Sequence, residues 1–299
     1  MPYNRLNMRA RLRQQLQRGL VVAPFVYDAF QAKIAQRVGL EAVYMTGFGT
    51  AAARGYADVG LLTMTEMVDN VASISAAVDL PLIADADTGY GNPLNVQRTV
   101  QAYERAGVAA MHIEDQVFPK KCGFMQGKMV IPQAEMVQKV RAALEARDDT
   151  DLVIIARTDA LAVHGWDDTE ARARAYYEAG ADMVFVDGIH TLEALDAYAR
   201  HLEDVPRLYN GGLRPTTDIA AMGFRLMITG GTLWAVYDAV QTVMHELKEH
   251  GTTGGHRLRG NFFEEVASLL GLPQVYELER RYHVNDALPT QPVRSATAG

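Results

Sequence analysis

The segment Arg-Ala-Gly-Val-Ala-Ala-Met-His at residues 105–112 has the form of a helix end, a glycine and then an apolar run. The same order of features recurs at residues 37–44, 178–185 and 221–228. A glycine in this place is typical of a helix that ends in a left-handed residue before a short loop into a strand. The apolar runs show little polar alternation, which indicates strands that are covered on both faces, as in a parallel sheet.

Four further apolar runs, at residues 20–23, 82–84, 152–156 and 207–209, bring the total to eight. The stretches between the runs are amphipathic and begin with helix starters, such as Asn92-Pro93 before Leu94. Eight strand–helix units in sequence favour a closed barrel, because an open doubly wound sheet more often has about five or six strands. We therefore predict an α/β fold of the (β/α)8 TIM-barrel class.

We predict one barrel domain over residues 1–299, because roughly 250 residues is the usual size of such a barrel. Residues 1–18 are expected to form an N-terminal helix. Residues 262–283 are expected to contain additional C-terminal helices. The segment 118–130 has too many glycines and lysines for a packed helix, so we expect it to form a lid over the barrel mouth.

The composition excludes several classes of protein. Hydrophobic residues make up 48% of the 299 residues, and the net charge of −7 offers no basic excess for binding nucleic acid. No apolar run approaches the roughly 18 residues that cross a bilayer. The single cysteine excludes an intrachain disulfide and favours a reducing compartment. We therefore expect a soluble, cytoplasmic protein that binds a small molecule and has no nucleic-acid or membrane partner.

Charged side chains follow the apolar runs, at the end of the strands where a barrel has its active site. Asp85 and Asp87 follow the third of the eight runs, and Glu114 follows the fourth. Carboxylates at this density repel one another unless a cation lies among them, and oxygen ligands favour Mg²⁺, with Mn²⁺ as an alternative. We predict that these three residues bind the metal. The alternative is that each acid caps the helix that follows it.

Two further residues in this region are suited to chemistry. The planar guanidinium of Arg157 suits a substrate carboxylate, although an ion pair with Asp159 or Glu114 would also explain this arginine. Cys122 follows two lysines that would lower the pKa of its thiol, so we expect it to be reactive rather than inert filler. His112, near the end of the fourth run, is interpreted as a packing residue.

Four motifs together resemble the isocitrate lyase and phosphoenolpyruvate mutase superfamily. They are Asp-Ala-Asp-Thr-Gly-Tyr-Gly-Asn at residues 85–92, Ile-Glu-Asp-Gln at 113–116, Pro-Lys-Lys-Cys-Gly at 119–123 and Ala-Arg-Thr-Asp-Ala at 156–160. The resemblance extends over nearly the whole chain. The cysteine in the lid resembles the lyase branch, which contains isocitrate, 2-methylisocitrate and dimethylmalate lyases, whereas the mutases of the superfamily usually lack it.

The resemblance implies roles for the matching positions. It implies Mg²⁺ near Asp85, Asp87 and Glu114, with Asp58 in the outer shell and Cys122 as the proton donor. It further implies a homotetramer in which the C-terminal helices are swapped between barrels. The expected catalytic residues are Cys122, Lys121, Tyr44 and Arg157, and the expected substrate-binding residues are Tyr44, Thr46, Gly47, Phe48, Asp85, Gly123, Phe124, Arg157, Asp187 and Asn210.

Three positions differ from the lyase pattern. Phe124 stands where the lyases usually have histidine, and Asp187 stands where they commonly have glutamate. Asn210 is followed by Gly211 and Gly212, where the lyases often have a segment that contains glutamate. These differences leave fewer polar partners for a tricarboxylate. We therefore expect a smaller or more apolar 2-hydroxy dicarboxylate as the substrate.

The expected reaction is a retro-aldol cleavage of a 2-hydroxy carboxylate of the 2-methylisocitrate or dimethylmalate type. A bound metal would acidify the 2-hydroxyl group, a base such as Tyr44 or Asp187 would take its proton, and Cys122 would protonate the departing fragment. The alternatives are an oxaloacetate decarboxylase, a mutase that acts on carboxyphosphonoenolpyruvate or phosphoenolpyruvate, and a ligand-binding relative without catalysis.

Overall fold

The computed structural model describes residues 5–123, 125–254 and 262–283. The chain divides into two compact units, Met1–Thr242 and Val243–Gly299. The first unit contains the barrel and the first part of α11. The second contains the rest of α11 and two further helices.

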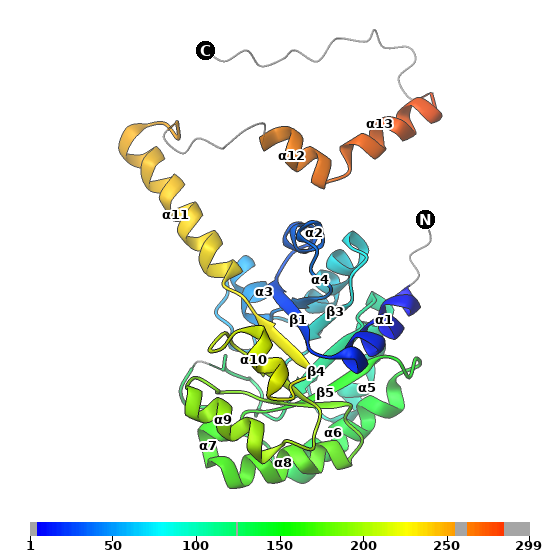
Figure 1. The fold of residues 1–299 in the computed structure, drawn as a ribbon, viewed down its shortest axis with the longest axis vertical. Coiled ribbons are helices and arrows are strands. Elements are labelled where there is room, and N and C mark those ends of the chain that lie inside the picture. The colour runs from blue at the N-terminus through cyan, green and yellow to red at the C-terminus, as the bar shows by residue number, and fades with distance from the viewer. Residues whose placement is uncertain (1–4, 124, 255–261, 284–299) are drawn as a thin grey trace. The chain divides into compact units, whose positions relative to one another are not determined.

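Eight parallel strands form the centre of the first unit (Figure 1). They pair in sequence order, and β1 also pairs with β8, which closes the barrel. The predicted fold class is confirmed, and each apolar run contributes one strand. The strands are β1 (Val21–Val26), β2 (Val43–Met45), β3 (Leu82–Asp85), β4 (Ala110–Glu114), β5 (Val153–Thr158), β6 (Met183–Val186), β7 (Arg207–Asn210) and β8 (Leu226–Thr229).

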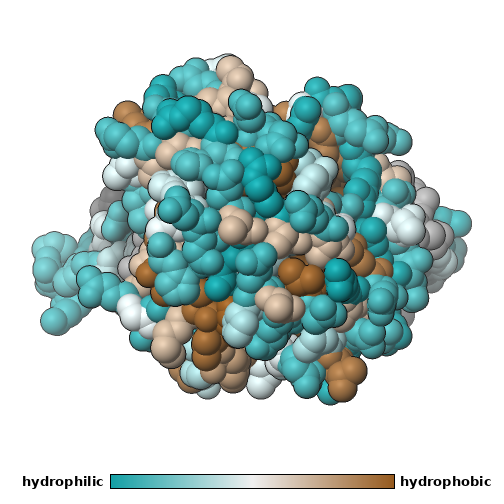
Figure 2. Space-filling model, turned by 90° about the horizontal axis from the view of Figure 1, so that it is seen from below, coloured by the Kyte–Doolittle hydropathy of each residue, from teal (hydrophilic) through white to brown (hydrophobic). Residues whose placement is uncertain are grey.

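Helices surround the strands. The helices of the first unit are α1 (Arg5–Arg18), α2 (Ala29–Val38), α3 (Gly47–Ala53), α4 (Met64–Ala77), α5 (Pro93–Ala106), α6 (Gln133–Ala146), α7 (Leu161–His164), α8 (Trp166–Glu178), α9 (Leu192–His201) and α10 (Thr216–Ala221), and α11 (Thr232–His250) continues into the second. The face shown in Figure 2 is mostly hydrophilic, with hydrophobic residues in scattered patches. Among the described residues, no helix is long and apolar enough to span a membrane.

The repeated glycine ends helices as the sequence predicts. Gly107 follows α5 with a φ of 104°, and its N–H donates to the carbonyl oxygens of Tyr103 and Glu104. This left-handed conformation is costly for a residue with a Cβ, so glycine lets the chain turn directly into β4. At the other end of α5, the side chain of Asn92 accepts the N–H of Leu94 and caps the helix.

The alternation of strand side chains divides the core into an inner and an outer layer. In β4, Met111 and Ile113 belong to the outer cluster, under the surrounding helices, and Ala110 belongs to the cluster inside the barrel. Because successive side chains point to opposite faces, His112 and Glu114 share the inner face with Ala110. The same alternation therefore places charged residues at the mouth of the barrel and apolar residues under the helices.

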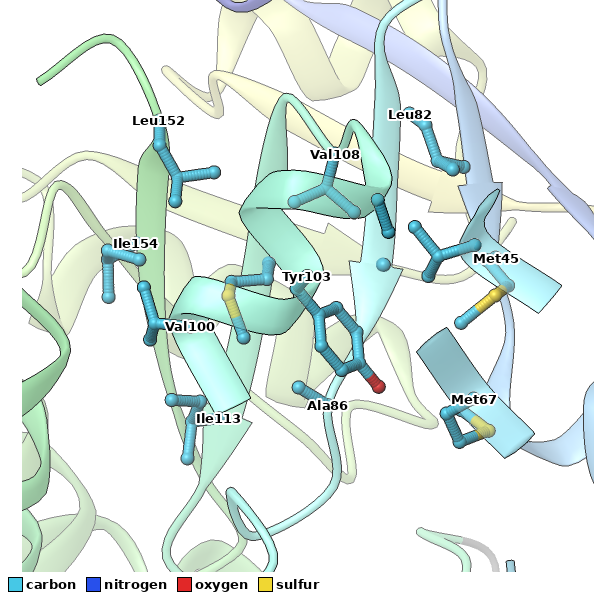
Figure 3. Packing of buried hydrophobic residues seen from close by; sticks show 14 of the residues in the cluster. Met45, Met67, Leu82, Ala86, Val100, Tyr103, Val108, Ile113, Leu152 and Ile154 are labelled. Atoms are coloured by element: carbon cyan, nitrogen blue, oxygen red, sulfur yellow. The ribbon is translucent and has the colours of Figure 1, made fainter. Parts of the chain in front are cut away.

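Tyr103 of α5 connects the outer core to the acidic end of β3. Its ring is fully buried and lies near Ala86 and Met67 (Figure 3). Its hydroxyl group donates to the carbonyl oxygen of Asp85 at 3.0 Å. This bond holds the backbone of β3 where the acidic segment begins.

The helix α1 closes the amino-terminal end of the barrel. Leu12 is fully buried in the cluster that fills the barrel interior. Arg9 donates to the carbonyl oxygen of Val108 at 3.1 Å and pairs with Asp149 at 3.0 Å. This end of the barrel is therefore closed, which leaves the opposite end, where the strands finish, open for a binding site.

The second unit contains the C-terminal helices that the sequence predicts. They are α12 (Phe262–Leu269) and α13 (Leu272–Arg281). Gly271 joins them with a φ of 86°. Large apolar side chains of both helices, including Phe263 and Leu278, are exposed.

Replacing Leu12 with alanine is expected to lower the free energy of unfolding by about 2–5 kcal/mol, because the lost methyl groups leave a cavity in the barrel. Gln14 lies on the exposed side of the same helix, so Gln14→Ala should change it by less than about 0.5 kcal/mol. Urea unfolding followed by circular dichroism measures both values. Equally small effects would show that α1 is not part of the core.

Candidate active site

A pocket of about 70 Å³ lies at the carboxyl ends of the strands. We call it the charged pocket, because acidic and basic side chains supply much of its lining. It is lined by Phe25, Tyr44, Thr46, Phe48, Asp58, Asp85, Lys120, Cys122, Gly123, Arg157, Asp187 and Asn210. The strand ends and the lid thus meet around one small space.

Asp85 ends β3 and is held by backbone groups. Its Oδ2 accepts the N–H of Gly47 at 3.2 Å, and its Oδ1 accepts the N–H of Asp87 at 2.9 Å. A Cβ on Gly47 would collide with this carboxylate, so glycine is what allows the start of α3 to approach it. Asp87 has a φ of 47°, which is uncommon for a residue other than glycine. The turn after β3 is therefore shaped around the Asp85 carboxylate.

The carboxyl groups of Asp85 and Asp87 differ in acidity. Burial raises the pKa of Asp87 to about 6, despite the nearby ammonium group of Lys120. Burial also opposes ionisation of Asp85, but the imidazole of His112 in its protonated form and the charged side chains of Lys120 and Arg157 outweigh burial and lower the pKa of Asp85. Asp85 is therefore the stronger acid of the pair.

Glu114 is fully buried and poorly partnered. Burial raises its pKa well above the usual range, although Nε of Arg157 lies 3.2 Å from its Oε2. Neither carboxylate oxygen has a hydrogen-bond partner in the part of the chain that the structure describes. Buried polar atoms without partners are costly, and an ion or an ordered water is the usual remedy.

Lys120 in the lid inserts its ammonium group among the acids. Its Nζ lies 2.5 Å from Oδ1 of Asp58 and 2.9 Å from Oδ1 of Asp87, and the second contact is an ion pair without hydrogen-bond geometry. Burial would lower the pKa of Lys120, but the carboxylates of Asp87 and Asp85 outweigh burial and raise it. The charged lysine therefore anchors the lid to the acidic turn after β3.

Lys128 forms a second anchor at the far end of the lid. Its Nζ lies 2.9 Å from Oδ1 of Asp159 and 3.4 Å from Oδ2 of Asp187, and it donates to the carbonyl oxygen of Gly123. Arg157 contacts the same two acids, with Nε 2.8 Å from Asp159 and Nη2 3.3 Å from Asp187. The ion pairs that the sequence offers as the alternative explanation of Arg157 are therefore present, and the arginine also lines the charged pocket.

Cys122 lies between the two anchors and lines the charged pocket. Its side chain is buried, and its backbone N–H donates to the carbonyl oxygen of Asp58 at 3.0 Å. A Cβ on the next residue, Gly123, would collide with the carboxylate of Asp187, so only glycine permits this close approach. The lid thus brings the thiol to the rim that carries the acids.

Tyr44 and His112 form a hydrogen-bonded pair inside the barrel, which the interpretation of His112 as a packing residue misses. The Tyr44 hydroxyl lies 2.8 Å from Nε2 of His112. Burial lowers the pKa of His112 to about 4 and raises the pKa of Tyr44 well above 10. Both side chains are therefore neutral at neutral pH. Nδ1 of His112 lies 3.8 Å from Asp85 and has no hydrogen bond within the described chain.

The acids suit a hydrated divalent cation. No three histidine, cysteine or acidic side chains of the described residues lie close enough together to hold a metal directly. Asp85, Asp87 and Glu114 therefore do not form a preformed three-ligand centre. Mg²⁺ commonly keeps several waters and is bound through one or two carboxylates. The ionised Asp85 and the oxygens of Glu114, which accept no hydrogen bond from the described residues, fit that mode of binding.

Most residues that the sequence predicts for the site are brought together. The predicted residues that line the charged pocket are Tyr44, Thr46, Phe48, Asp58, Asp85, Cys122, Gly123, Arg157, Asp187 and Asn210. Gly47, Asp87 and Glu114 adjoin it through the contacts given above. Lys121 does not line it, because its Nζ donates to the carbonyl oxygens of Gly127 and Gln126. Phe124 lies outside the described residues.

Three residues of the site are absent from the sequence prediction. They are Lys120, Lys128 and Phe25. Lys120 stands in the same motif as Cys122, but nothing in an irregular loop tells which of two adjacent lysines faces inward. Phe25 belongs to an apolar run that reads as core.

The chain matches known proteins over most of its length. The family model for phosphoenolpyruvate phosphomutase matches residues 10–248. The 2,3-dimethylmalate lyase of Eubacterium barkeri is 41% identical over 288 residues, which cover 93% of this chain and 99% of the relative. The 2-methylisocitrate lyase of Aeropyrum pernix is 42% identical over 242 residues, which cover 79% and 78% of the two chains.

Solved structures show the same architecture. A crystal structure of 2,3-dimethylmalate lyase has a TM-score of 0.86 and 36% identity, covering 98% of this chain and 100% of that one. Oxaloacetate acetylhydrolase in complex with 3,3-difluorooxalacetate has a TM-score of 0.87 and 36% identity, covering 93% and 98%. Phosphonopyruvate hydrolase in complex with oxalate and Mg²⁺ has a TM-score of 0.85 and 30% identity, covering 92% and 99%.

Lys120→Met is expected to loosen the lid, because it removes the ion pairs with Asp58 and Asp87. Hydrogen exchange of the Cys122 amide should accelerate about tenfold for each ~1.4 kcal/mol of lid stability that is lost. Lys121→Met removes only contacts within the lid and serves as the matched control. Mass spectrometry of peptides from residues 117–130 measures both. Equal protection in the two variants would show that Lys120 is not an anchor.

His112→Asn is expected to reduce the loss of stability in acid. The folded protein keeps His112 neutral down to about pH 4, whereas the unfolded chain takes up a proton below its ordinary pKa of 6.5. The contribution of His112 to the free energy of unfolding is therefore fully present above pH 6.5. It is lost as the pH falls towards 4, and the free energy of unfolding then decreases by up to about 3 kcal/mol. Urea unfolding from pH 7 to pH 4 tests this. Parallel stability curves for the two proteins would contradict it.

Proposed function

Because this chain belongs to the phosphoenolpyruvate phosphomutase family, within the phosphoenolpyruvate mutase and isocitrate lyase superfamily, we propose that it is a Mg²⁺-dependent carbon–carbon lyase. It cleaves a small 2-hydroxy carboxylate of the dimethylmalate or 2-methylisocitrate type into a 2-oxo acid and a carboxylate. The observation that carries this proposal is that Cys122 lines the same pocket as Asp85 and Arg157. A reaction that ends by protonating carbon uses such an acid.

Asp85 would hold the proposed ion, with Asp58, Asp87 and Glu114 as further acids close by. When bound, Mg²⁺ supplies a Lewis acid that makes the 2-hydroxyl group of the substrate more acidic. The complex of phosphonopyruvate hydrolase with oxalate and Mg²⁺, at 30% identity, supports a divalent ion in this fold. The oxygens of Glu114, which accept no hydrogen bond from the described residues, support one at this place in the chain.

Arg157 is the proposed anchor for a substrate carboxylate. Asp159 accepts hydrogen bonds from its Nε and Nη2 at 2.8 and 3.0 Å, which fixes the plane of the guanidinium group. This arrangement leaves Nη1 for the substrate. Thr46 and Asn210 line the same pocket and offer neutral polar groups. An arginine that is already oriented loses little freedom when a carboxylate binds.

The proposed cleavage transfers one proton to a base and one proton to carbon. A base takes the proton of the 2-hydroxyl group, the bond between C2 and C3 breaks with its electron pair left on C3, and the thiol of Cys122 gives its proton to C3. The proton on the base then restores the thiol. Asp187 is the proposed base, because its carboxylate lines the charged pocket. Tyr44 is assigned to hydrogen bonding, because burial raises its pKa too far for a phenolate.

The lid keeps water away from the carbanion-like fragment. Lys120 and Lys128 anchor the two ends of the lid to buried acids, so the closed state excludes a competing proton source. Lys121 is assigned an indirect role, because its contact with the carbonyl oxygen of Gly127 braces the loop that carries Cys122.

A second candidate is the cleavage of a 2-oxo dicarboxylate such as oxaloacetate. The TM-score of 0.87 to oxaloacetate acetylhydrolase supports it. Three reactions are distinguished by their products. A lyase acting on a 2-hydroxy acid releases a 2-oxo acid and a carboxylate, hydrolysis of oxaloacetate releases oxalate and acetate, and decarboxylation of oxaloacetate releases CO2. Mass spectrometry of the products separates all three.

We also propose a homotetramer in which the C-terminal helices pack against neighbouring barrels, in the cytoplasm. Exposed large apolar side chains support this assembly, because such surfaces are stabilised by burial in an interface. Among them are Tyr237, Phe263, Val275 and Leu278. The single cysteine fits a reducing compartment.

Cys122→Ser is expected to lower turnover of 2,3-dimethylmalate by about 100-fold or more, because a hydroxyl group is a much weaker acid than a thiol. Mg²⁺ affinity, measured by calorimetry, should be unchanged. Release of pyruvate reports turnover. Met129→Leu changes an exposed side chain of the same lid and is the matched control.

Full turnover of the serine variant would remove Cys122 from the chemistry. If the unmodified enzyme releases CO2 and forms no second carboxylate product, the reaction is a decarboxylation and the lyase assignment is wrong. No product from any 2-hydroxy or 2-oxo acid in the presence of Mg²⁺ would favour a ligand-binding relative without catalysis.

A further inference from the structure

A second cavity adjoins the charged pocket and is larger, at about 490 Å³ compared with about 70 Å³. We call it the apolar chamber. Phe25, Thr46, Phe48, Cys122 and Asn210 line both cavities. The two spaces are therefore parts of one continuous site.

The apolar chamber has aromatic and aliphatic walls. Phe48 of α3 and Trp234 of α11 form one wall, with ring centroids 5.8 Å apart, and Met125 of the lid contributes another. Gly211 and Gly212, after β7, take up almost no space. None of the described residues that line the chamber carries a charge. A carboxylate placed here would lose its hydration without gaining a cation, whereas an alkyl group would gain from burial.

Cys122 lies where the two cavities meet. The carbon that receives its proton must lie at that junction, with the two carboxylates of the substrate on the charged side. A substituent on that carbon then points into the apolar chamber. This geometry separates a polar reaction centre from an apolar binding site for the remainder of the substrate.

We propose that the apolar chamber binds an alkyl branch on C3 of a 2-hydroxy dicarboxylate, and that branches longer than methyl are preferred. This inference rests on the proposed lyase function. The bonds that break and form are those given above, so a 3-alkylmalate yields glyoxylate and a carboxylate that carries the alkyl chain. The chamber thus makes the chain length and charge of the C3 branch the basis of selectivity.

A series of malates with methyl, ethyl, propyl and isobutyl groups on C3 tests the proposal. The ratio kcat/KM should rise about fourfold for each methylene that enters the chamber, which corresponds to ~0.8 kcal/mol of burial. The 3-isobutyl and 3-carboxymethyl compounds have similar shapes but differ in charge. The isobutyl compound should have at least about a tenfold higher kcat/KM than its charged counterpart, a difference of ~1.4 kcal/mol.

A variant that fills the chamber gives the matched test. A Cβ at Gly212 would meet only Oγ1 of Thr229, at 3.6 Å, so a side chain is accepted locally. Gly212→Leu should reverse the preference for propyl over methyl, and Gly212→Ala should largely keep it. Binding of 2-butylsuccinate, which lacks the hydroxyl group and is not cleaved, should quench tryptophan fluorescence in the unmodified protein and not in Trp234→Phe.

The outcomes separate this inference from the proposed function. Cleavage of 3-methylmalate without any gain for longer branches, or equal rates for the isobutyl and carboxymethyl compounds, would overturn the inference and leave the lyase assignment in place. Failure to cleave every malate would overturn the proposed function. Fluorescence quenching by 2-butylsuccinate that persists in Trp234→Phe would place the alkyl group outside the chamber.

Discussion

Negative charge buried at the mouth of the barrel is the constraint on which the rest of the site depends. Acidic side chains from the ends of the strands and the loops that follow them meet there, and they outnumber the lysines and arginine that face them. Each unpaired carboxylate in a buried place costs free energy unless it is protonated, hydrogen-bonded or matched by a cation. Burial raises the pKa values of Asp87 and Glu114 even though Lys120 and Arg157 lie nearby, which shows that ionising these two carboxyl groups is costly. A divalent cation would supply the positive charge that the lysines and the arginine of the site do not provide.

The same charges connect the lid to the reaction centre. Asp159 and Asp187 contact both Lys128 of the lid and Arg157, the proposed anchor for the substrate. Any movement of the lid therefore changes the electrostatic surroundings of the arginine. Lys120 does the same for the turn that carries Asp87. The contacts that hold the predicted lid in place are therefore the same contacts that organise the proposed site.

The sequence predicts the barrel and most of the site because the relevant patterns are local. A glycine before four of the apolar runs marks a helix end, and an acid at the end of a parallel strand must lie near the acids of the neighbouring strands. Side-chain direction in the lid is not set by the local pattern: Lys120 faces inward because of acids distant in the sequence, whereas Lys121 turns to carbonyl oxygens of its own loop. The partnership of Tyr44 with His112 depends on the register of β2, β3 and β4, which the apolar pattern leaves open.

A crystal soaked in Mn²⁺ and measured at the manganese absorption edge tests the central claim most directly. The charge imbalance predicts one anomalous peak in the charged pocket beside Asp85, with water completing the coordination. A fully occupied peak elsewhere, or no peak beside Asp85 at saturating Mn²⁺, would show that the buried acids are not balanced by a divalent cation. The proposed lyase chemistry would then lose its basis.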